Sequence, residues 1–250
     1  MTTFKRQRSK NKEGLVEKGQ QFHFQQLVAI LQLLDVPWAR RPLDDIHIQF
    51  GRIEGMSSRR GNVVFLRDIL DEARDRMVVA MQNKKTTRTG DIEAIADRLA
   101  VSAVVVQDLR ARRRNNYTFS WDRMLSFSAQ SGVFLQYAHS RLCSLIEKCG
   151  VQKTVDIDVS CLHEQEMHQL ILLLARYPEV IEDMLASLEP CTLVQYLLKL
   201  GHLVNSAYSK LPVKGENSDV AQARLLVFDC GRQVLSNGLQ LIGIQPLKEM

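Results

Sequence analysis

A chain of 250 residues with 45% hydrophobic content can bury a substantial core, in one domain or in two small ones. The 33 Lys and Arg residues outnumber the 28 Asp and Glu residues, and this modest positive excess fits an anionic partner without proving one. The five cysteines include no Cys-x-x-Cys pair, which argues against a disulfide framework or a zinc ribbon. No apolar run approaches the roughly 18 residues of a membrane span, so we expect a soluble protein in a reducing compartment.

The amino-terminal residues form a basic, nearly apolar-free tail. Five Lys and Arg side chains precede the first acid, Glu13, and this composition predicts a disordered segment over residues 1–14. The tail also lacks the apolar face of an organellar targeting peptide.

The next elements predict part of a parallel α/β unit. Apolar residues recur at helical spacing over residues 20–34, and Pro37 ends the pattern. Residues 46–50 predict a short strand. A helix followed by a strand normally needs neighbouring strands to cover it, so we expect this chain to be a fragment of a larger domain.

Residues 50–66 have a composition that suits neither helix nor strand, with three glycines, two serines and three arginines. Glycines let the backbone approach a ligand closely, and adjacent guanidiniums such as those of Arg59 and Arg60 suit a polyanion. Most basic surface loops are solvated and bind nothing, so composition alone leaves phosphate binding open.

The loop sequence from residue 55 to residue 61, Gly-Met-Ser-Ser-Arg-Arg-Gly, followed by Asn-Val-Val-Phe-Leu, resembles the second signature loop of class I aminoacyl-tRNA synthetases in its arginyl form. The usual lysine is arginine here at Arg60. The resemblance implies a catalytic loop whose arginines stabilise charge on the phosphates of ATP in the transition state. Its implied catalytic residues are Met56, Ser57, Ser58, Arg59 and Arg60.

Residues 16–24, Val-Glu-Lys-Gly-Gln-Gln-Phe-His-Phe, resemble the family segment Val-Asp-x-x-Gln-x-x-His-Phe. The resemblance implies that Gln20 contacts the arginine substrate and that His23 supports the site without touching substrate. By residue type alone, a histidine between two phenylalanines is more often a hydrogen-bonded core residue. No His-x-Gly-His tetrapeptide, the first signature of the class, occurs in the 250 residues, so we expect the preceding half of the catalytic domain to be missing.

The rest of the chain predicts a helical bundle. The expected helices span residues 66–82, 91–99, 101–113, 164–177, 179–188, 192–208 and 218–241. Pro178 and Pro190 stand at first-turn positions, and Gly243 follows the last helix. An arginine cluster at residues 110–114 either complements a helix dipole or contacts nucleic-acid phosphates, and the sequence leaves both open. His163 and His168 beside Cys161 diverge on a helix, so we predict no metal site.

Several segments of the bundle also resemble arginyl-tRNA synthetases. They include Phe-x-Trp-Asp-Arg-Met at residues 119–124 and Gly-x-Phe-Leu-Gln-Tyr-x-His-x-Arg-Leu at residues 132–142. By helical spacing, Phe134, Tyr137 and Arg141 share one stripe, which is more often core than a base-stacking surface. The resemblance implies anticodon-loop contacts instead. Its implied RNA-binding residues are Phe134, Tyr137, Arg141, Tyr208 and the terminal Met250.

The resemblance covers about residues 16–250 and implies the carboxyl-terminal half of an arginine–tRNA ligase of the eukaryotic cytosolic or mitochondrial type, inactive without the other half. The implied fold is mainly α: a remnant of a Rossmann-type catalytic domain at residues 15–85, with a helix and a short strand, precedes an all-α anticodon-binding bundle at residues 86–250. The implied partners are arginine, ATP with Mg²⁺ and the tRNA for arginine, with no permanent cofactor, no DNA and no membrane. We expect a cytoplasmic or mitochondrial monomer.

Two other functions stay open. One, which the resemblance also allows, is a non-catalytic tRNA-binding helical module that kept the anticodon bundle. The other is a helical DNA-binding or scaffold protein that uses the arginine cluster. In either case, an isolated remnant of a parallel sheet would present uncovered apolar surface and dissolve poorly.

Overall fold

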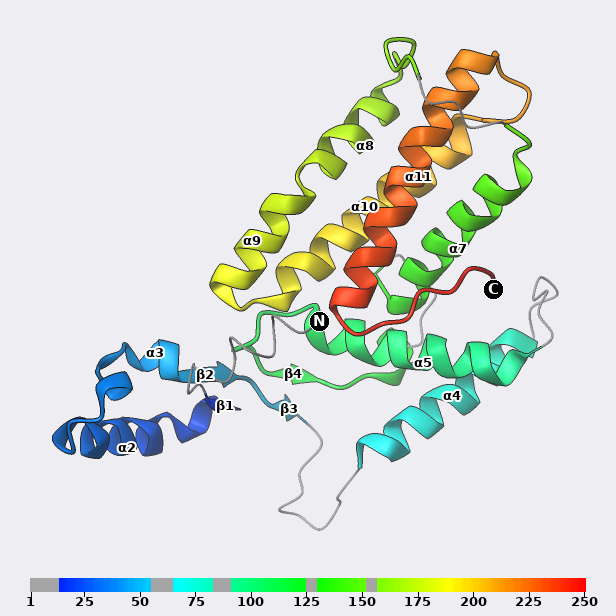
Figure 1. Cartoon of the computed structure of the whole chain (residues 1–250). Coiled ribbons are helices and arrows are strands. Elements are labelled where there is room, and N and C mark those ends of the chain that lie inside the picture. The colour runs from blue at the N-terminus through cyan, green and yellow to red at the C-terminus, as the bar shows by residue number, and fades with distance from the viewer. Residues whose placement is uncertain (1–13, 55–64, 83–90, 125–129, 152–156) are drawn as a thin grey trace. The chain divides into compact units, whose positions relative to one another are not determined.

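A computed structural model of the chain describes residues 14–54, 65–82, 91–124, 130–151 and 157–250 (Figure 1). Within these ranges the chain is mainly helical, as the sequence predicts. It divides into two compact units. The first comprises residues 1–63 and 112–119, and the second comprises residues 64–111 and 120–250.

The first unit is built on two parallel strands. β1 (Gly14–Glu17) pairs with β2 (His47–Phe50), with Gly14 opposite His47. A parallel pair needs a crossover connection between its strands. The crossover consists of η1 (Lys18–Gln20), α2 (Gln21–Leu33), η2 (Pro37–Arg40) and α3 (Leu43–Ile46). The predicted helix and strand are both present, but the strand begins one residue later than expected because Ile46 closes α3.

α2 ends where Asp35 adopts the left-handed conformation, with φ 52°. The N–H of Asp35 donates to the carbonyl of Gln32 (3.1 Å), and the N–H of Val36 donates to the carbonyl of Leu31 (3.0 Å). These bonds satisfy carbonyls that a helix end leaves open. Pro37 follows and cannot continue the helix.

Among the described residues of the first unit, few apolar side chains are buried: Val28, Ala39, Ile46 and Ile48. The fully buried ring of His47 stacks on the ring of Phe24, with 4.3 Å between the two ring centroids. Large apolar side chains of β1 and α2 lie exposed instead, which confirms the expected uncovered surface. Their exposed fractions are 86% for Leu33, 69% for Phe22, 68% for Leu34, 67% for Leu15 and 55% for Ile30.

Residues 112–119 complete the first unit. β4 (Tyr117–Thr118) pairs in parallel with β3 (Ile53–Glu54). At the corner before β3, the N–H of Gly51 donates to the carbonyl of Arg113 at 2.7 Å. A Cβ at Gly51 would lie 2.1 Å from the carbonyl oxygen of Asn115, so this close approach requires glycine.

The second unit is a helical bundle, as predicted. α4 packs against α5, α5 packs against α7, and α10 and α11 pack against each other and against both α7 and α8 (Figure 1). Pro178 and Pro190 lie in the first turns of α9 and α10. The helices are α4 (Leu66–Gln82), α5 (Ile92–Leu109), α6 (Trp121–Met124), α7 (Gly132–Lys148), α8 (Gln165–Ala175), α9 (Tyr177–Ser187), α10 (Pro190–Lys210) and α11 (Ser218–Leu241).

α5 is one helix where the sequence predicts two. Its N-cap Asp91 accepts a hydrogen bond from the N–H of Ala94 at 3.0 Å. Ala100, at the expected break, is a strong helix former and is buried, so the helix continues through it. The helix ends with Arg110 as its C-cap. Its expected extension to residue 113 is therefore wrong, and residues 112–114 belong to the first unit.

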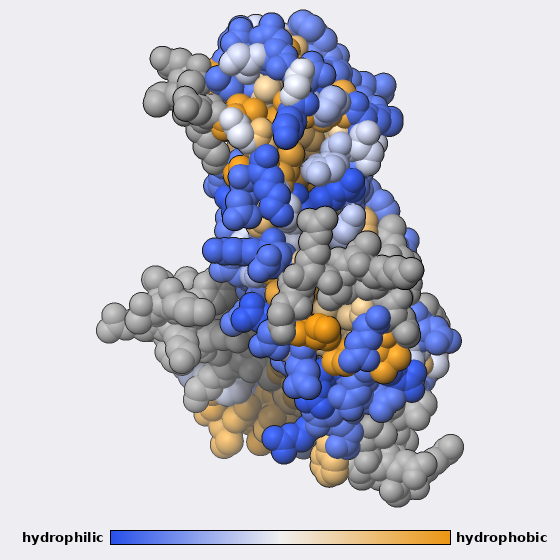
Figure 2. Space-filling model, turned by 90° about the vertical axis from the view of Figure 1, so that its right-hand side faces the viewer, coloured by the Kyte–Doolittle hydropathy of each residue, from blue (hydrophilic) through white to orange (hydrophobic). Residues whose placement is uncertain are grey.

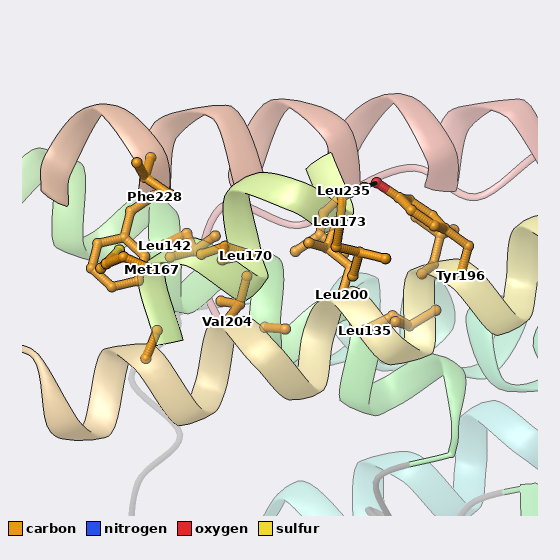
Figure 3. Close-up of a cluster of buried hydrophobic side chains, with 14 of the residues drawn as sticks. Leu135, Leu142, Met167, Leu170, Leu173, Tyr196, Leu200, Val204, Phe228 and Leu235 are labelled. Atoms are coloured by element: carbon orange, nitrogen blue, oxygen red, sulfur yellow. Dashed lines mark hydrogen bonds between the residues drawn. The ribbon is translucent and has the colours of Figure 1, made fainter. Parts of the chain in front are cut away.

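The core of the second unit lies among α7, α8, α10 and α11 (Figure 3). The hydroxyl of Tyr196 donates to the carbonyl of Leu173 at 3.0 Å, which satisfies the polar end of this buried side chain. Burying a leucine or phenylalanine side chain contributes about 1.5–3 kcal/mol. The side chains at the centre are Leu135, Leu142, Met167, Leu170, Leu200, Val204, Phe228 and Leu235.

Hydrophilic residues predominate on the face that Figure 2 shows, and apolar residues appear there as separate patches. Across the described ranges, none of the helices combines the length and the apolar character that a membrane crossing requires.

Candidate functional sites

α7 presents a buried face and an outward face. Its N-cap Ser131 accepts a hydrogen bond from the N–H of Phe134 at 3.2 Å. A Cβ at Gly132 would lie 2.0 Å from the carbonyl oxygen of Ser102, so the glycine lets α7 approach α5 closely. While its inward side chains enter the core, Tyr137 remains 47% exposed. α7 therefore offers an aromatic ring to solvent from a firmly packed helix.

Arg141 joins the two predicted tyrosines into one cluster. Its guanidinium carbon lies 3.8 Å from the centroid of the Tyr208 ring and 5.8 Å from that of Tyr137. Its Nη1 donates to Oδ1 of Asn205 at 3.3 Å. Tyr208 also meets the buried Phe228 edge-on at 6.3 Å. α7 and α10 thus hold a cation and two rings on the same side of the bundle.

Phe134 is more enclosed than Tyr137. Its ring lies over Gly201, where a Cβ would come within 2.9 Å of it, and 5.0 Å from the ring of the exposed His202. The predicted stripe therefore continues along α10 with a second aromatic pair. We call the surface formed by Phe134, Tyr137, Arg141, His202, Asn205 and Tyr208 the α7/α10 surface.

Neither His202 nor Asn205 is among the residues that the sequence assigns to RNA. Asn205 stands three residues before Tyr208, and this helical spacing is a signal that could have placed both on one face. No local pattern marks His202, because its role depends on how α10 packs against Phe134.

The predicted terminal residue Met250 follows a segment that is bound to α7. Nε2 of Gln136 donates to the carbonyl of Gln245, and its Oε1 accepts from the N–H of Leu247, both at 2.8 Å. Nδ1 of His139 donates to the carbonyl of Leu247 at 2.8 Å. Burial lowers the pKa of His139 although this hydrogen bond opposes the shift, so the ring is neutral near pH 7. Met250 itself is partly exposed.

In the first unit, Gln20 and His23 are both exposed. Gln20 closes η1 and is the N-cap of α2. The ring of His23 meets Phe24 edge-on, at 5.8 Å between centroids, and Phe24 in turn stacks on His47. The predicted catalytic residues Met56, Ser57, Ser58, Arg59 and Arg60 lie outside the described residues.

A polar pocket of about 380 Å³ adjoins the segment that contains Gln20. A salt bridge of 2.9 Å between Glu17 and Arg52 crosses its lining. The hydrogen bond from Arg52 is the largest cause of the lowered pKa of Glu17. Gln20 is not among the lining residues, which are Glu17, Lys18, Gly19, Gln21, Gln49, Arg52 and Asn116.

The arginine cluster at residues 110–114 is divided between the two units. Nη1 of Arg113 donates to the carbonyl of Gln49 at 2.6 Å, and Arg114 pairs with Asp44 at 2.9 Å. These two arginines brace the first unit rather than extend a helix end. Both lie beyond the end of α5, so the helix-dipole interpretation does not describe them, and contact with nucleic-acid phosphates stays a prediction.

The predicted absence of a metal site concerned Cys161, His163 and His168. Nε2 of His168 donates to the carbonyl of Leu162 at 2.9 Å. Among the residues that the structure describes, no group of three or more His, Cys, Asp and Glu side chains is arranged to hold a metal ion.

Two family models match the chain. Residues 5–121 match the catalytic domain of class I (R) tRNA synthetases, and residues 135–250 match the DALR anticodon binding domain. Together with a parallel strand pair and a helical bundle, these matches define part of a class I aminoacyl-tRNA synthetase that includes its anticodon-binding domain.

Curated relatives narrow the class. The chain is 42% identical over 238 residues to a probable cytoplasmic arginine–tRNA ligase of Dictyostelium discoideum. The matched region covers 94% of this chain and 40% of that protein. It is also 42% identical over 242 residues to the mitochondrial arginine–tRNA ligase of Saccharomyces cerevisiae, over 94% of this chain and 37% of that protein. The arginyl-tRNA synthetase of Thermus thermophilus superposes with a TM-score of 0.81 at 25% identity, over 94% of this chain and 40% of that chain.

The chain belongs to the arginyl-tRNA synthetase family. It spans about 40% of the length of the curated relatives that it matches.

Proposed function

We propose that this chain is the carboxyl-terminal part of an arginine–tRNA ligase and that its bundle binds the anticodon loop of the tRNA for arginine. The observation that carries the proposal is the position of Arg141 against the rings of Tyr208 and Tyr137, on α7 and α10 of the domain that matches the DALR family. Unpaired RNA bases stack on exposed aromatic rings, and a guanidinium binds phosphate or stacks on a base.

Within the bundle, Phe134, Tyr137, Arg141 and Tyr208 supply the stacking and cationic groups, and Met250 adds an apolar contact. Asn205 holds the guanidinium of Arg141 in place. These contacts would read single-stranded bases and fix the tRNA relative to the catalytic part.

The catalytic part, which we place at residues 15–85 with the anticodon-binding part at residues 86–250, would activate arginine with ATP and Mg²⁺. The carboxylate of arginine attacks the α-phosphate of ATP and pyrophosphate leaves, which gives arginyl adenylate. A hydroxyl of the terminal ribose of the tRNA then attacks the arginyl carbonyl carbon, and AMP leaves. Because charge builds on the phosphates, the loop from Met56 to Arg60 would favour the transition state by bringing Arg59 and Arg60 to them. Gln20 would contact arginine, with His23 supporting it.

The exposed apolar face of β1 and α2 favours a requirement for further protein at this unit. We therefore propose that the chain alone does not catalyse activation, and that a complete ligase is a cytoplasmic or mitochondrial monomer that binds neither DNA nor membranes. The second candidate, a non-catalytic tRNA-binding module, shares the α7/α10 surface and differs only in lacking catalysis altogether.

Two assays test these proposals. In the first, arginine-dependent exchange of pyrophosphate into ATP is measured for this chain, with an intact arginine–tRNA ligase as the positive control. We expect no exchange above background, and appreciable exchange would overturn the requirement for further protein.

In the second assay, the affinity of the chain for an arginine tRNA transcript is compared with its affinity for duplex DNA of equal length at the same salt concentration, because phosphate contacts alone are strongly salt-dependent. We expect selective retention of the tRNA. Equal binding of both nucleic acids would overturn the anticodon-binding proposal and favour a DNA-binding protein.

A further inference from the structure

The last residues of the chain return to α7 after α11 ends. Gly243, with φ 85°, follows α11, and the N–H of Ile244 donates to the carbonyl of Leu239 at 2.9 Å. Ile244 and Leu247 are then buried, with exposed fractions of 1% and 4%. Two apolar anchors therefore fix residues 244–247, which we call the tail segment.

Gln136 binds the backbone of the tail segment as a neighbouring strand would. Its amide donates to the carbonyl of Gln245 and accepts from the N–H of Leu247, two groups that lie two residues apart. The same Nε2 also donates to Oγ of Ser102 on α5 at 2.9 Å. Gln136 is fully buried, so losing it would leave these backbone groups unpaired, which is costly inside a protein.

His139 adds a third bond to the same segment. It lies three residues after Gln136 on α7, is only 3% exposed, and its Nδ1 donates to the carbonyl of Leu247 at 2.8 Å. The N–H and carbonyl of Leu247 are therefore both paired with α7, one with each side chain.

The same turns of α7 carry the proposed RNA contacts. Tyr137 directly follows Gln136, and neighbouring helix residues point about 100° apart. Gln136 and His139 thus face the tail segment, while Tyr137 and Arg141 face Tyr208 and solvent. Since Met250 is only three positions after Leu247, it lies at most about 10 Å from this anchor.

We propose that Gln136 and His139 are positioning residues for RNA binding, which hold the tail segment and thereby set the path of the chain to Met250 without touching RNA themselves. This inference rests on the proposed function, because it assumes that residues 248–250 contribute to the RNA-binding surface. It assigns a role to two side chains that neither helical spacing nor the family resemblance had assigned.

The first test needs no RNA. Amide hydrogen exchange of residues 245–247 is measured in the whole chain and in Gln136→Leu, His139→Leu and His139→Asn. We expect faster exchange of the Leu247 amide in the first two variants. His139→Asn should retain protection because its side-chain N–H can replace that of Nδ1. Ser140→Ala is the control, since Ser140 is buried on α7 but bonds to the carbonyl of Tyr137 within the helix. Unchanged exchange in both leucine variants would overturn the inference.

The second test measures affinity for the arginine tRNA transcript, with each variant shown to be folded by circular dichroism. Deleting residues 245–250 should weaken binding roughly tenfold, within the range for one lost base contact. Gln136→Leu and His139→Leu should each weaken it by a similar factor and add little to the deletion, because all three remove the same positioned segment.

The outcomes separate the two proposals. If the intact chain does not bind the transcript, the proposed function fails and the RNA role of the tail segment fails with it. If the intact chain binds but the losses multiply in the combined variants, Gln136 and His139 do not act through the tail segment and the inference alone is overturned. If His139→Asn keeps the affinity that His139→Leu loses, the positioning role is supported.

Discussion

The guanidinium of Arg141 stacks on the ring of Tyr208, with 3.8 Å from its central carbon to the ring centroid. A stacked guanidinium keeps its N–H groups at its edges, where they can meet phosphate or a base, and Asn205 already holds one edge at 3.3 Å. A lysine would preserve the charge but neither the plane nor the fork of donors.

We therefore expect Arg141→Lys to weaken binding of arginine tRNA about tenfold and Tyr137→Ala to weaken it by a factor of about 5–150, the range for one stacked base. The unfolding temperature should change little for Tyr137→Ala, because its ring is half exposed. Affinities measured by filter retention or anisotropy at fixed salt would check this. Arg232→Lys is the matched control, since Arg232 pairs with Asp229 within α11. A loss as large in the control would mean that the weakening is not specific to the stacked guanidinium of Arg141.

Gly201 controls where the ring of Phe134 lies. A Cβ there would stand 2.9 Å from the ring edge, so Gly201→Ala should push the ring away and change the ring-current shift of the His202 protons, which NMR can follow. Since a ring can rotate aside, we expect a stability change within about 1 kcal/mol. In a chain that already carries Phe134→Leu, Gly201→Ala should no longer change the chemical shifts of the His202 protons, because the ring that causes the ring-current shift is absent.

Gly231→Ala is the control for that change. Its Cβ would make an ordinary 3.5 Å contact with Val204, and alanine within a helix is favoured over glycine by about 0.5–1 kcal/mol. Gly231→Ala should therefore stabilise the chain and leave His202 unchanged. An altered His202 signal in Gly231→Ala would contradict the assignment.

Arg224 links α11 to Glu164 at the start of α8. Its 9% exposed side chain is hydrogen-bonded to Glu164 and lies 3.4 Å from Glu216. Burial opposes ionisation of Glu164, but the hydrogen bond and charge of Arg224 together with backbone hydrogen bonds outweigh it and lower the pKa of that carboxyl. Because the pKa is lower in the folded chain, the stabilisation is complete above the ordinary value of 4.5 and disappears as the pH falls through the folded pKa.

We expect Glu164→Gln to lower the free energy of unfolding at pH 7 by about 2 kcal/mol, less than the ~3–5 kcal/mol for a fully buried pair, because Glu216 remains beside Arg224. The difference from the unsubstituted chain should shrink below about pH 4.5. Urea titrations at several pH values would measure this. In the exposed pair of Glu166 with Lys210, Glu166→Gln should lower the free energy of unfolding much less, because solvent screens this pair. Equal losses for the two variants would contradict the prediction.

The apolar face of α2 should drive self-association of the chain on its own. Burying an exposed leucine side chain in a contact between two copies of the chain stabilises that contact by about 1.5–3 kcal/mol at most. Leu33→Lys should therefore weaken self-association about tenfold, as measured by sedimentation velocity. Leu172→Lys on α8, where Leu172 is 68% exposed, should leave it unchanged. A monomeric, monodisperse chain at all concentrations would contradict this prediction.

The sequence predicted the helices and strands better than it predicted the side-chain contacts between residues that are distant in the sequence. Helical spacing placed Phe134, Tyr137 and Arg141 on one stripe because that relation lies within α7. The bond from Arg141 to Asn205 spans 64 positions and depends on how two helices pack. Likewise, Arg52 binds Glu17 across 35 positions, and no periodicity reports such a contact.

The wrong prediction of two helices over residues 91–113 has the same cause, because contacts with distant residues decide the structure there. Residues 91–113 contain a weak interruption in apolar spacing, which led to two expected helices. Burial of Ala100 against the bundle decides for a single one. The last two arginines of the cluster at residues 110–114 also make contacts with residues that are distant in the sequence. Arg113 donates a hydrogen bond to the carbonyl of Gln49, and Arg114 forms a salt bridge with Asp44. The catalytic assignment of Met56 to Arg60 stays a prediction.

Gly51 and its hydrogen bond to the carbonyl of Arg113 bear on how this chain can be dissected. Because α4 and α5 belong to the second unit while residues 112–119, which follow them, belong to the first, no single cut yields the first unit whole. A gene fragment that stops before residue 112 would lack β4 and the carbonyl that Gly51 requires. Excision of residues 64–111 with a short designed bridge, rather than simple truncation, is the route to a minimal first unit.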